Sequence, residues 1–116
     1  MMADKIFGIH GDALRLRSQR LSMLASNIAN SATPGYKAKD LDFERAMQEV
    51  RGGSDADRAA KGNAGYRIPL NPSLDGNTVE LSTEQTLFAE NAVGYSTTLS
   101  FLEGRVATLT RALKGE

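Results

Sequence analysis

The 116-residue sequence predicts a mainly α-helical fold, in which long N- and C-terminal helices pair as an antiparallel coiled coil. Three observations lead to this prediction. Apolar residues recur at every seventh position near the N-terminus, an unbroken heptad pattern fills the C-terminal region, and the stretch between them is polar and rich in glycine. We therefore expect an N-terminal helix within residues 1–31, an irregular and partly extended segment over 32–80, and a C-terminal helix over 81–116, with both ends forming one assembly domain.

The N-terminal helix is predicted over about residues 4–31, with Asp4 as its cap. Its first apolar stripe, which repeats every seven residues, consists of Phe7, Leu14, Leu21 and Ile28. A second apolar line on another face consists of Ile9, Ala13, Leu16 and Met23. A chain this short offers few internal partners, so we expect one face to pack within the chain and the other to need neighbouring subunits.

Stop signals follow this helix at residues 30–35, which read NSATPG, and residues 36–40 then read as extended. A short helix is predicted over 43–51, because its apolar residues share one face, Asp42 can cap it, and Gly52 and Gly53 end it.

The stretch 52–80 reads as a loop, and residues 53–65 contain almost no apolar side chain larger than alanine. We expect 53–65 to be a flexible excursion. Tyr66, Ile68 and Leu70 alternate with other residues, which is typical of a short strand or an extended arm.

The C-terminal helix carries the clearest periodicity in the chain. Its stripe is spaced alternately by four and three residues and consists of Phe88, Ala92, Tyr95, Leu99, Leu102, Val106, Leu109 and Leu113. Ser82 and Gln85 fit a capping box at its start, and Glu84 falls in its first turn. A heptad seam needs a partner, so we expect this stripe to pair with Leu14, Leu21 and Ile28 of the first helix.

The amino-acid composition argues against nucleic-acid binding and against most kinds of metal or catalytic site. The 14 basic residues balance the 14 acidic ones, so the chain lacks the positive surplus typical of nucleic-acid binding. With one His and no Cys, it offers no thiolate metal site and no cysteine nucleophile. Carboxylates at 40, 42 and 44 resemble the start of a calcium loop, but Arg45 and Arg51 stand where Gly and Glu are required. We expect no catalytic residue, metal, cofactor or small-molecule substrate, and hence no enzyme.

The stretch LASNIANSATPGY at residues 24–36 resembles the Asn-rich signature that ends the N-terminal helix of bacterial flagellar rod and hook axial proteins. Residues 36–43 and 72–81 resemble, within that group, the FlgB family of proximal-rod proteins. The resemblance implies that Asn27, Asn30, Thr33, Gly35 and Tyr36 shape the turn by which the chain leaves the helix and contacts adjacent subunits.

The same resemblance implies a structural subunit of the proximal rod, which polymerises with other axial proteins and transmits torque from the motor to the hook and filament. Its implied partners are copies of itself, other rod proteins, rod-base proteins at the MS ring and export gate, and the export apparatus. The implied location is the periplasmic rod, reached by flagellar type III export without a cleaved signal peptide. No apolar run approaches the roughly 20 residues of a membrane span, so direct membrane insertion is not expected.

Some alternatives stay open from sequence. Phe43 and Met47 fit the short export motif of early flagellar substrates, but they also fit one face of a short helix. The related proximal-rod subunit FlgC is the nearest alternative within the group. A soluble helical-hairpin adaptor or regulator is the alternative from a different functional class.

Overall fold

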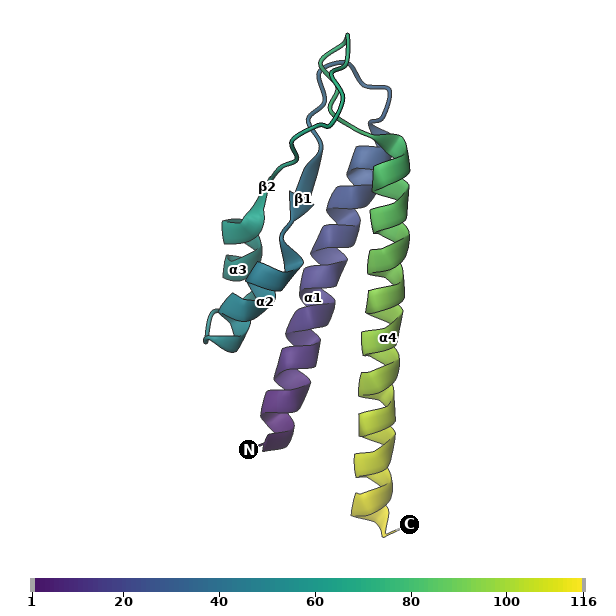
Figure 1. Cartoon of the computed structure of the whole chain (residues 1–116). Coiled ribbons are helices and arrows are strands. Elements are labelled where there is room, and N and C mark those ends of the chain that lie inside the picture. The colour runs from purple at the N-terminus through teal and green to yellow at the C-terminus, as the bar shows by residue number, and fades with distance from the viewer. Residues whose placement is uncertain (1, 116) are drawn as a thin grey trace.

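The computed structural model describes residues 2–115, with side chains described from residue 8 onward. Its elements, in chain order, are α1 (Met2–Ala29), β1 (Lys39–Leu41), α2 (Phe43–Arg51), α3 (Ala56–Asn63), β2 (Ala64–Tyr66) and α4 (Leu81–Lys114). The molecule is elongated, with extents of 65 × 26 × 17 Å. Figure 1 shows α1 in the middle, with α4 along one side and α2, α3 and both strands along the other.

The two long helices, α1 and α4, run antiparallel and contact each other along their length, which confirms the predicted fold class. Toward the end of the pair where α1 begins, the rings of His10 and Phe101 lie with their centroids 4.5 Å apart. Halfway along, the side-chain amide of Asn91 donates to the backbone oxygen of Arg17 over 2.8 Å. The helices therefore pack as a hairpin whose connection is the whole middle segment.

The helix predicted over 43–51 is confirmed as α2. Asp42 caps it, because its Oδ1 accepts from the backbone N–H of Arg45 over 3.2 Å. Ala46, Met47 and Val50 form its buried face.

The expectation of a flexible excursion over 53–65 is wrong, because most of that stretch forms helix α3. Asp55 caps the helix by accepting from the backbone N–H of Arg58 over 2.8 Å. Ala56, Ala59 and Ala60 are buried. Alanine is the strongest helix former, and its small side chain lets the α3 backbone approach α1 and α2 closely. A core built on alanine needs no large apolar residue, so its sequence resembles a polar loop.

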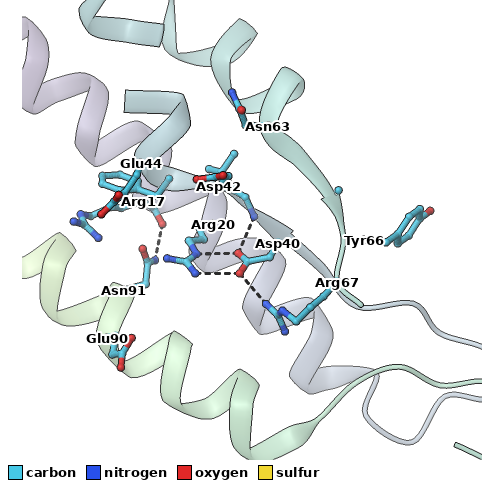
Figure 2. Close-up of a pocket in the computed structure, with 13 residues that line it drawn as sticks. Arg17, Arg20, Asp40, Asp42, Glu44, Asn63, Tyr66, Arg67, Glu90 and Asn91 are labelled. Carbon is cyan, nitrogen blue, oxygen red and sulfur yellow. Dashed lines mark hydrogen bonds and ion pairs between the residues drawn. The ribbon is translucent and has the colours of Figure 1, made fainter. Parts of the chain in front are cut away.

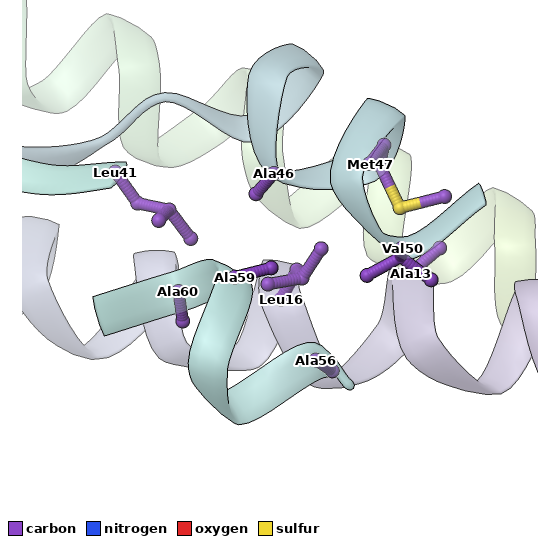
Figure 3. Close-up of a cluster of buried hydrophobic side chains, with 9 residues drawn as sticks. All are labelled: Ala13, Leu16, Leu41, Ala46, Met47, Val50, Ala56, Ala59 and Ala60. Atoms are coloured by element: carbon purple, nitrogen blue, oxygen red, sulfur yellow. The ribbon is translucent and has the colours of Figure 1, made fainter. Parts of the chain in front are cut away.

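Most of the second apolar face of α1 is therefore packed inside the chain and needs no neighbouring subunit, which corrects that part of the expectation, while Ile9 near its start is exposed. Ala13 and Leu16 belong to the buried cluster, and Met23 packs against its edge. Figure 3 shows the cluster, which consists of Ala13, Leu16, Leu41, Ala46, Met47, Val50, Ala56, Ala59 and Ala60.

The two strands form an antiparallel pair in which Lys39 lies opposite Tyr66 and Leu41 opposite Ala64. The pairing continues past the strand ends, since the backbone N–H of Arg67 donates to the oxygen of Ala38 over 2.9 Å. The predicted extended stretches are thus present, although β2 ends at Tyr66 and the residues after it form an irregular loop.

Two predicted helix caps are wrong. α1 begins at Met2, so Asp4 lies inside the helix rather than before it. α4 begins at Leu81 after Glu80, which makes no side-chain capping bond, so the box of Ser82 and Gln85 does not start the helix. Glu84 lies in the first turn of α4, as predicted, and its side chain is completely buried.

Candidate assembly site: the signature turn and the ionic cluster

The signature turn, residues 27–36, is held by hydrogen bonds among its own members. Asn30 donates from Nδ2 to the backbone oxygen of Ser26 over 2.8 Å, and Thr33 donates from Oγ1 to Asn30 Oδ1 over 3.0 Å. The backbone N–H of Tyr36 then donates to the oxygen of Thr33 over 3.2 Å. Gly35 has a φ of +76°, a left-handed conformation that a side chain disfavours. These residues therefore set the direction in which the chain leaves α1.

Asn77, which is distant in sequence, completes this turn. Its Nδ2 lies within hydrogen-bond distance of three backbone oxygens, those of Asn30 at 2.9 Å, Ser31 at 3.1 Å and Thr33 at 2.8 Å. Its Oδ1 accepts from the backbone N–H of Val79 over 2.7 Å. The side chain thus adds a donor to carbonyl groups of the turn after α1, two of which, those of Asn30 and Thr33, also accept backbone hydrogen bonds within the turn.

Asn27 lies in the last turn of α1 and is fully buried where α1, β1 and α4 meet. Its Nδ2 donates to the backbone oxygen of Lys39 over 2.7 Å, and its Oδ1 accepts from the backbone N–H of Lys39 over 3.0 Å. Nδ2 also lies 2.9 Å from Oε2 of Glu84. The hydroxyl of Tyr36 lies 3.4 Å from Asn27 Oδ1 and 3.0 Å from Ser26 Oγ. One amide therefore joins three elements.

Asn27 adjoins an ionic cluster formed by Arg20, Asp40, Arg67 and Glu84. Arg20 binds both oxygens of Asp40, from Nε over 2.8 Å and from Nη2 over 3.0 Å. Arg67 reaches the same carboxylate from Nη2 over 2.8 Å and also forms an ion pair with Glu84. Figure 2 shows Asp40 between the two arginines. The cluster thereby links α1, β1, the segment after β2 and α4.

The ion pairs shift the pKa values of Asp40 and Arg20. Burial by itself raises the pKa of Asp40, but hydrogen bonds from Arg20 and Arg67 outweigh burial and hold the pKa below its ordinary value. The bond to Asp40 in turn raises the pKa of Arg20. Both groups therefore stay charged in the folded chain, as a charge-assisted structural contact requires.

An open groove of about 630 Å³ lies beside the cluster, and Arg17 projects into it. The guanidinium of Arg17 stacks 4.0 Å from the ring of Phe43. On its other side lies Gly94 of α4, where an added Cβ would come within 2.5 Å of Arg17 Nη1. Burial and the nearby charge of Arg20 lower the pKa of Arg17. Gly94 thus leaves room for an arginine between α4 and α2.

The predicted seam residues fall into two groups. Leu14, Leu21, Ile28, Phe88, Ala92, Tyr95 and Leu102 are partly buried, whereas Leu99, Val106, Leu109 and Leu113 are exposed. The side chain of Phe7 lies outside the described residues. Of the most deeply buried α1 side chains, Leu24 lies on the face of the seven-residue stripe, between Leu21 and Ile28, whereas Leu16 belongs to the second apolar line.

The two residues that fit an export motif, Phe43 and Met47, lie on the inner face of α2. Met47 is buried in the alanine-rich cluster, and Phe43 packs against it. In the folded chain both side chains serve packing.

Four structural residues were not predicted from the sequence: Arg67, Asn77, Glu84 and Asn91. A weak signal was available for Glu84 and Asn91, since both lie on α4 and are seven residues apart, which places them on one helix face. Nothing local marks Arg67 or Asn77, because their partners lie far away in sequence.

Within residues 2–115, no group of three or more His, Asp or Glu side chains is arranged to hold a metal ion. In the same part of the chain, none of the helices is both long enough and apolar enough to cross a membrane. The site consists of paired charges, amides and turns.

Comparison with known proteins agrees with this architecture. A family model described as "Flagella basal body rod protein" matches residues 7–37, which include the signature turn. The chain is 46% identical over 120 residues to the flagellar basal body rod protein FlgB of Cereibacter sphaeroides, with 94% of each chain covered. It is 41% identical to FlgB of Aeromonas hydrophila, covering 97% of this chain and 96% of the relative. It is 38% identical to FlgB of Escherichia coli strain K12, covering 96% and 94%.

These similarities extend over nearly the whole chain and include the turn, the middle segment and both long helices. The chain therefore belongs to the FlgB family of flagellar basal body rod proteins.

Proposed function

We propose that this chain is a structural subunit of the flagellar basal body rod, and that it assembles there with other rod components. The observation that carries the proposal is near-full-length similarity to FlgB proteins in a chain whose two long helices form a hairpin, with the signature turn at the end of α1. The relatives reported above are named FlgB, so the alternative FlgC is not favoured. No contact in the described residues favours the soluble adaptor.

The finer proposal is that the subunit lies in the proximal, periplasmic part of the rod and transmits torque through helix packing. A two-helix hairpin braced by an ionic cluster suits this role, because paired buried charges resist sliding of one element past another. We propose no catalytic step, since the polar groups of the cluster are occupied by one another.

Its partners, in this proposal, are copies of itself, other rod proteins, and rod-base proteins at the MS ring and export gate. The chain would reach the rod through the flagellar type III export apparatus. The buried position of Met47 means that Phe43 and Met47 could act in export only while the chain is unfolded. The segments 1–31, 32–80 and 81–116 would form one assembly unit, because the middle packs on α1.

The signature residues divide into two roles. Asn27 is buried, so we assign it to joining α1 with β1 and α4. Thr33 and Gly35 are exposed, and Asn30 and Tyr36 are partly exposed, so these four remain accessible to adjacent subunits. The seam from Leu14 to Leu113 would complete its packing within the rod.

Complementation tests the proposal. The chain is expressed in a motile bacterium that lacks its own FlgB, and swimming in soft agar is measured. We expect swimming to be restored, and we expect Leu102→Asp to abolish it, because the change places a carboxylate in the seam between α1 and α4. The exposed neighbour Ser100→Asp serves as the control and should swim normally. A wild-type chain that is exported but leaves the cells immotile would count against a rod function.

A further inference from the structure

The two ends of the molecule both expose apolar side chains. At one end, the loop between β2 and α4 exposes Ile68 by 86%, Leu70 by 84% and Leu74 completely. We call these three residues the tip patch. At the other end, α4 exposes Val106 by 54%, Leu109 by 42% and Leu113 by 88%, and we call these the tail patch. Figure 1 shows the loop and the C-terminal end of α4 at opposite ends of the long axis.

The tip patch is presented on a fixed backbone. The N–H of Gly35 in the signature turn donates to the oxygen of Asp75 over 2.9 Å, and the N–H of Leu70 donates to Glu80 Oε1 over 3.2 Å. Lys37 Nζ also donates to the oxygen of Gly76. Pro69 and Pro72 further restrict the loop. Exposed apolar side chains on a rigid backbone are typical of a docking surface, because binding then costs little conformational entropy.

Charge indicates what would cover the tip patch. Asp75 and Glu80 flank it, and hydrogen bonds from the Asn77 backbone and Ser73 lower the pKa of Asp75, which keeps it ionised. The tail patch shows the complementary chemistry. After residue 100, the described part of α4 carries three basic residues, Arg105, Arg111 and Lys114, and one acidic residue, Glu103. An apolar helix end with more basic than acidic groups matches an apolar loop at which Asp75 and Glu80 outnumber the neighbouring cation, Lys37.

We propose that the tip patch docks on the tail patch of a neighbouring copy of this chain in the rod. This inference rests on the proposed function and adds the surface and the chemistry of the partner. The contact is heterologous, since tip and tail are different surfaces, and such contacts build open assemblies rather than closed pairs. In this proposal the signature turn positions the tip patch, because Gly35 and the carbonyl groups bound by Asn77 hold the loop in place.

Site-specific photo-cross-linking in assembled rods tests the proposal. Benzoylphenylalanine replaces Leu74 in the chain that complements a strain without its own FlgB, and a second strain carries it at Ile68. Basal bodies are purified and irradiated, and the cross-linked peptides are sequenced. The control carries it at Lys61, an exposed residue of α3 away from both patches. We expect Leu74 and Ile68 to cross-link to the tail patch of a second copy, about tenfold more than Lys61, because docking raises the local concentration of the partner.

Cross-links from both tip positions to another surface would overturn the proposal, as would yields no higher than those from Lys61. Cross-links to the tail of a second copy support the proposal, and cross-links only to the C-terminal helix of another rod protein overturn it; the peptide sequence tells the two apart. In parallel, Leu74→Asp should lower the amount of chain recovered in basal bodies about tenfold, because docking would bury a carboxylate. Basal bodies that contain the chain without tip cross-links reject this inference alone, whereas basal bodies that never contain the wild-type chain reject the proposed function.

Discussion

The side-chain amide of Asn27 exchanges two hydrogen bonds with the backbone of Lys39, donating over 2.7 Å and accepting over 3.0 Å. This is the pattern by which one strand pairs with the next, and here a helix side chain supplies it to the outer edge of β1. β2 pairs with the same strand, so β1 is held from both sides. The signature asparagine therefore fixes the middle segment against the helical hairpin.

Replacing Asn27 by Ala should lower the free energy of unfolding by about 2–3 kcal/mol, because it removes the partner of one buried oxygen of Glu84 and of the part-buried N–H and oxygen of Lys39. The measurement is urea unfolding of the purified chain. Asn71→Ala, in the exposed loop, is the control and should change stability by less than about 0.5 kcal/mol. Equal stability of the two variants would contradict the role given to Asn27.

Glu84→Gln should cost about 2–3 kcal/mol, since glutamine can still accept from Asn27 but removes the charge that faces Arg67 in a buried site. The matched control is Glu90→Gln on the same helix, where the carboxylate is exposed. Chemical denaturation followed by circular dichroism gives both values. If Glu90→Gln were the more damaging change, the ionic cluster would not brace the hairpin.

Stability should fall in acid partly through Asp40. Its pKa in the folded chain lies below the ordinary value, so the folded state binds this proton less readily than the unfolded state. Its contribution is therefore complete above the ordinary pKa of about 4 and is lost as the pH falls through the lowered folded pKa. Asp40→Asn should be less stable than the wild type at pH 7, and the difference should shrink below about pH 4. A difference that stays constant with pH would contradict this assignment, and Asp57→Asn, an exposed carboxylate, serves as the control.

Ala59→Leu should destabilise the chain by about 1–3 kcal/mol, because the completely buried Ala59 lies in the cluster shared by α1, α2 and α3 and leaves no room for three more carbons. The neighbouring exposed Arg58→Leu should have little effect. Thermal unfolding compares the two variants. Tolerance of leucine at position 59 would mean that α3 does not pack as described, and the flexible-loop expectation would then be restored.

The sequence predicted the elements whose signals are local or periodic. The heptad stripe from Phe88 to Leu113 led to α4, and Asp42 with the apolar face of residues 43–50 led to α2. α3 was missed because alanines packed closely against other helices carry no apolar periodicity that stands out from a polar loop. The second face of α1 was assigned to neighbouring subunits for the same reason, since the sequence did not reveal the element that covers Leu16.

The site was predictable only in part. Asn27, Asn30, Thr33, Gly35 and Tyr36 came from the resemblance, and the structure places them at the turn between α1 and β1. Arg67 and Asn77 could not be found, because each acts through a partner more than 15 residues away along the chain. Buried polar networks depend on which elements meet, and a single sequence does not contain that information.

The most direct measurement of the central claim is cryo-electron microscopy of basal bodies purified from a strain that carries this chain as its only FlgB. The account predicts rod density that fits an antiparallel pair of long helices with α2 and α3 packed on the shorter one, α1. Complete rods without such a subunit, or basal bodies that end below the rod while the chain remains outside them, would contradict it.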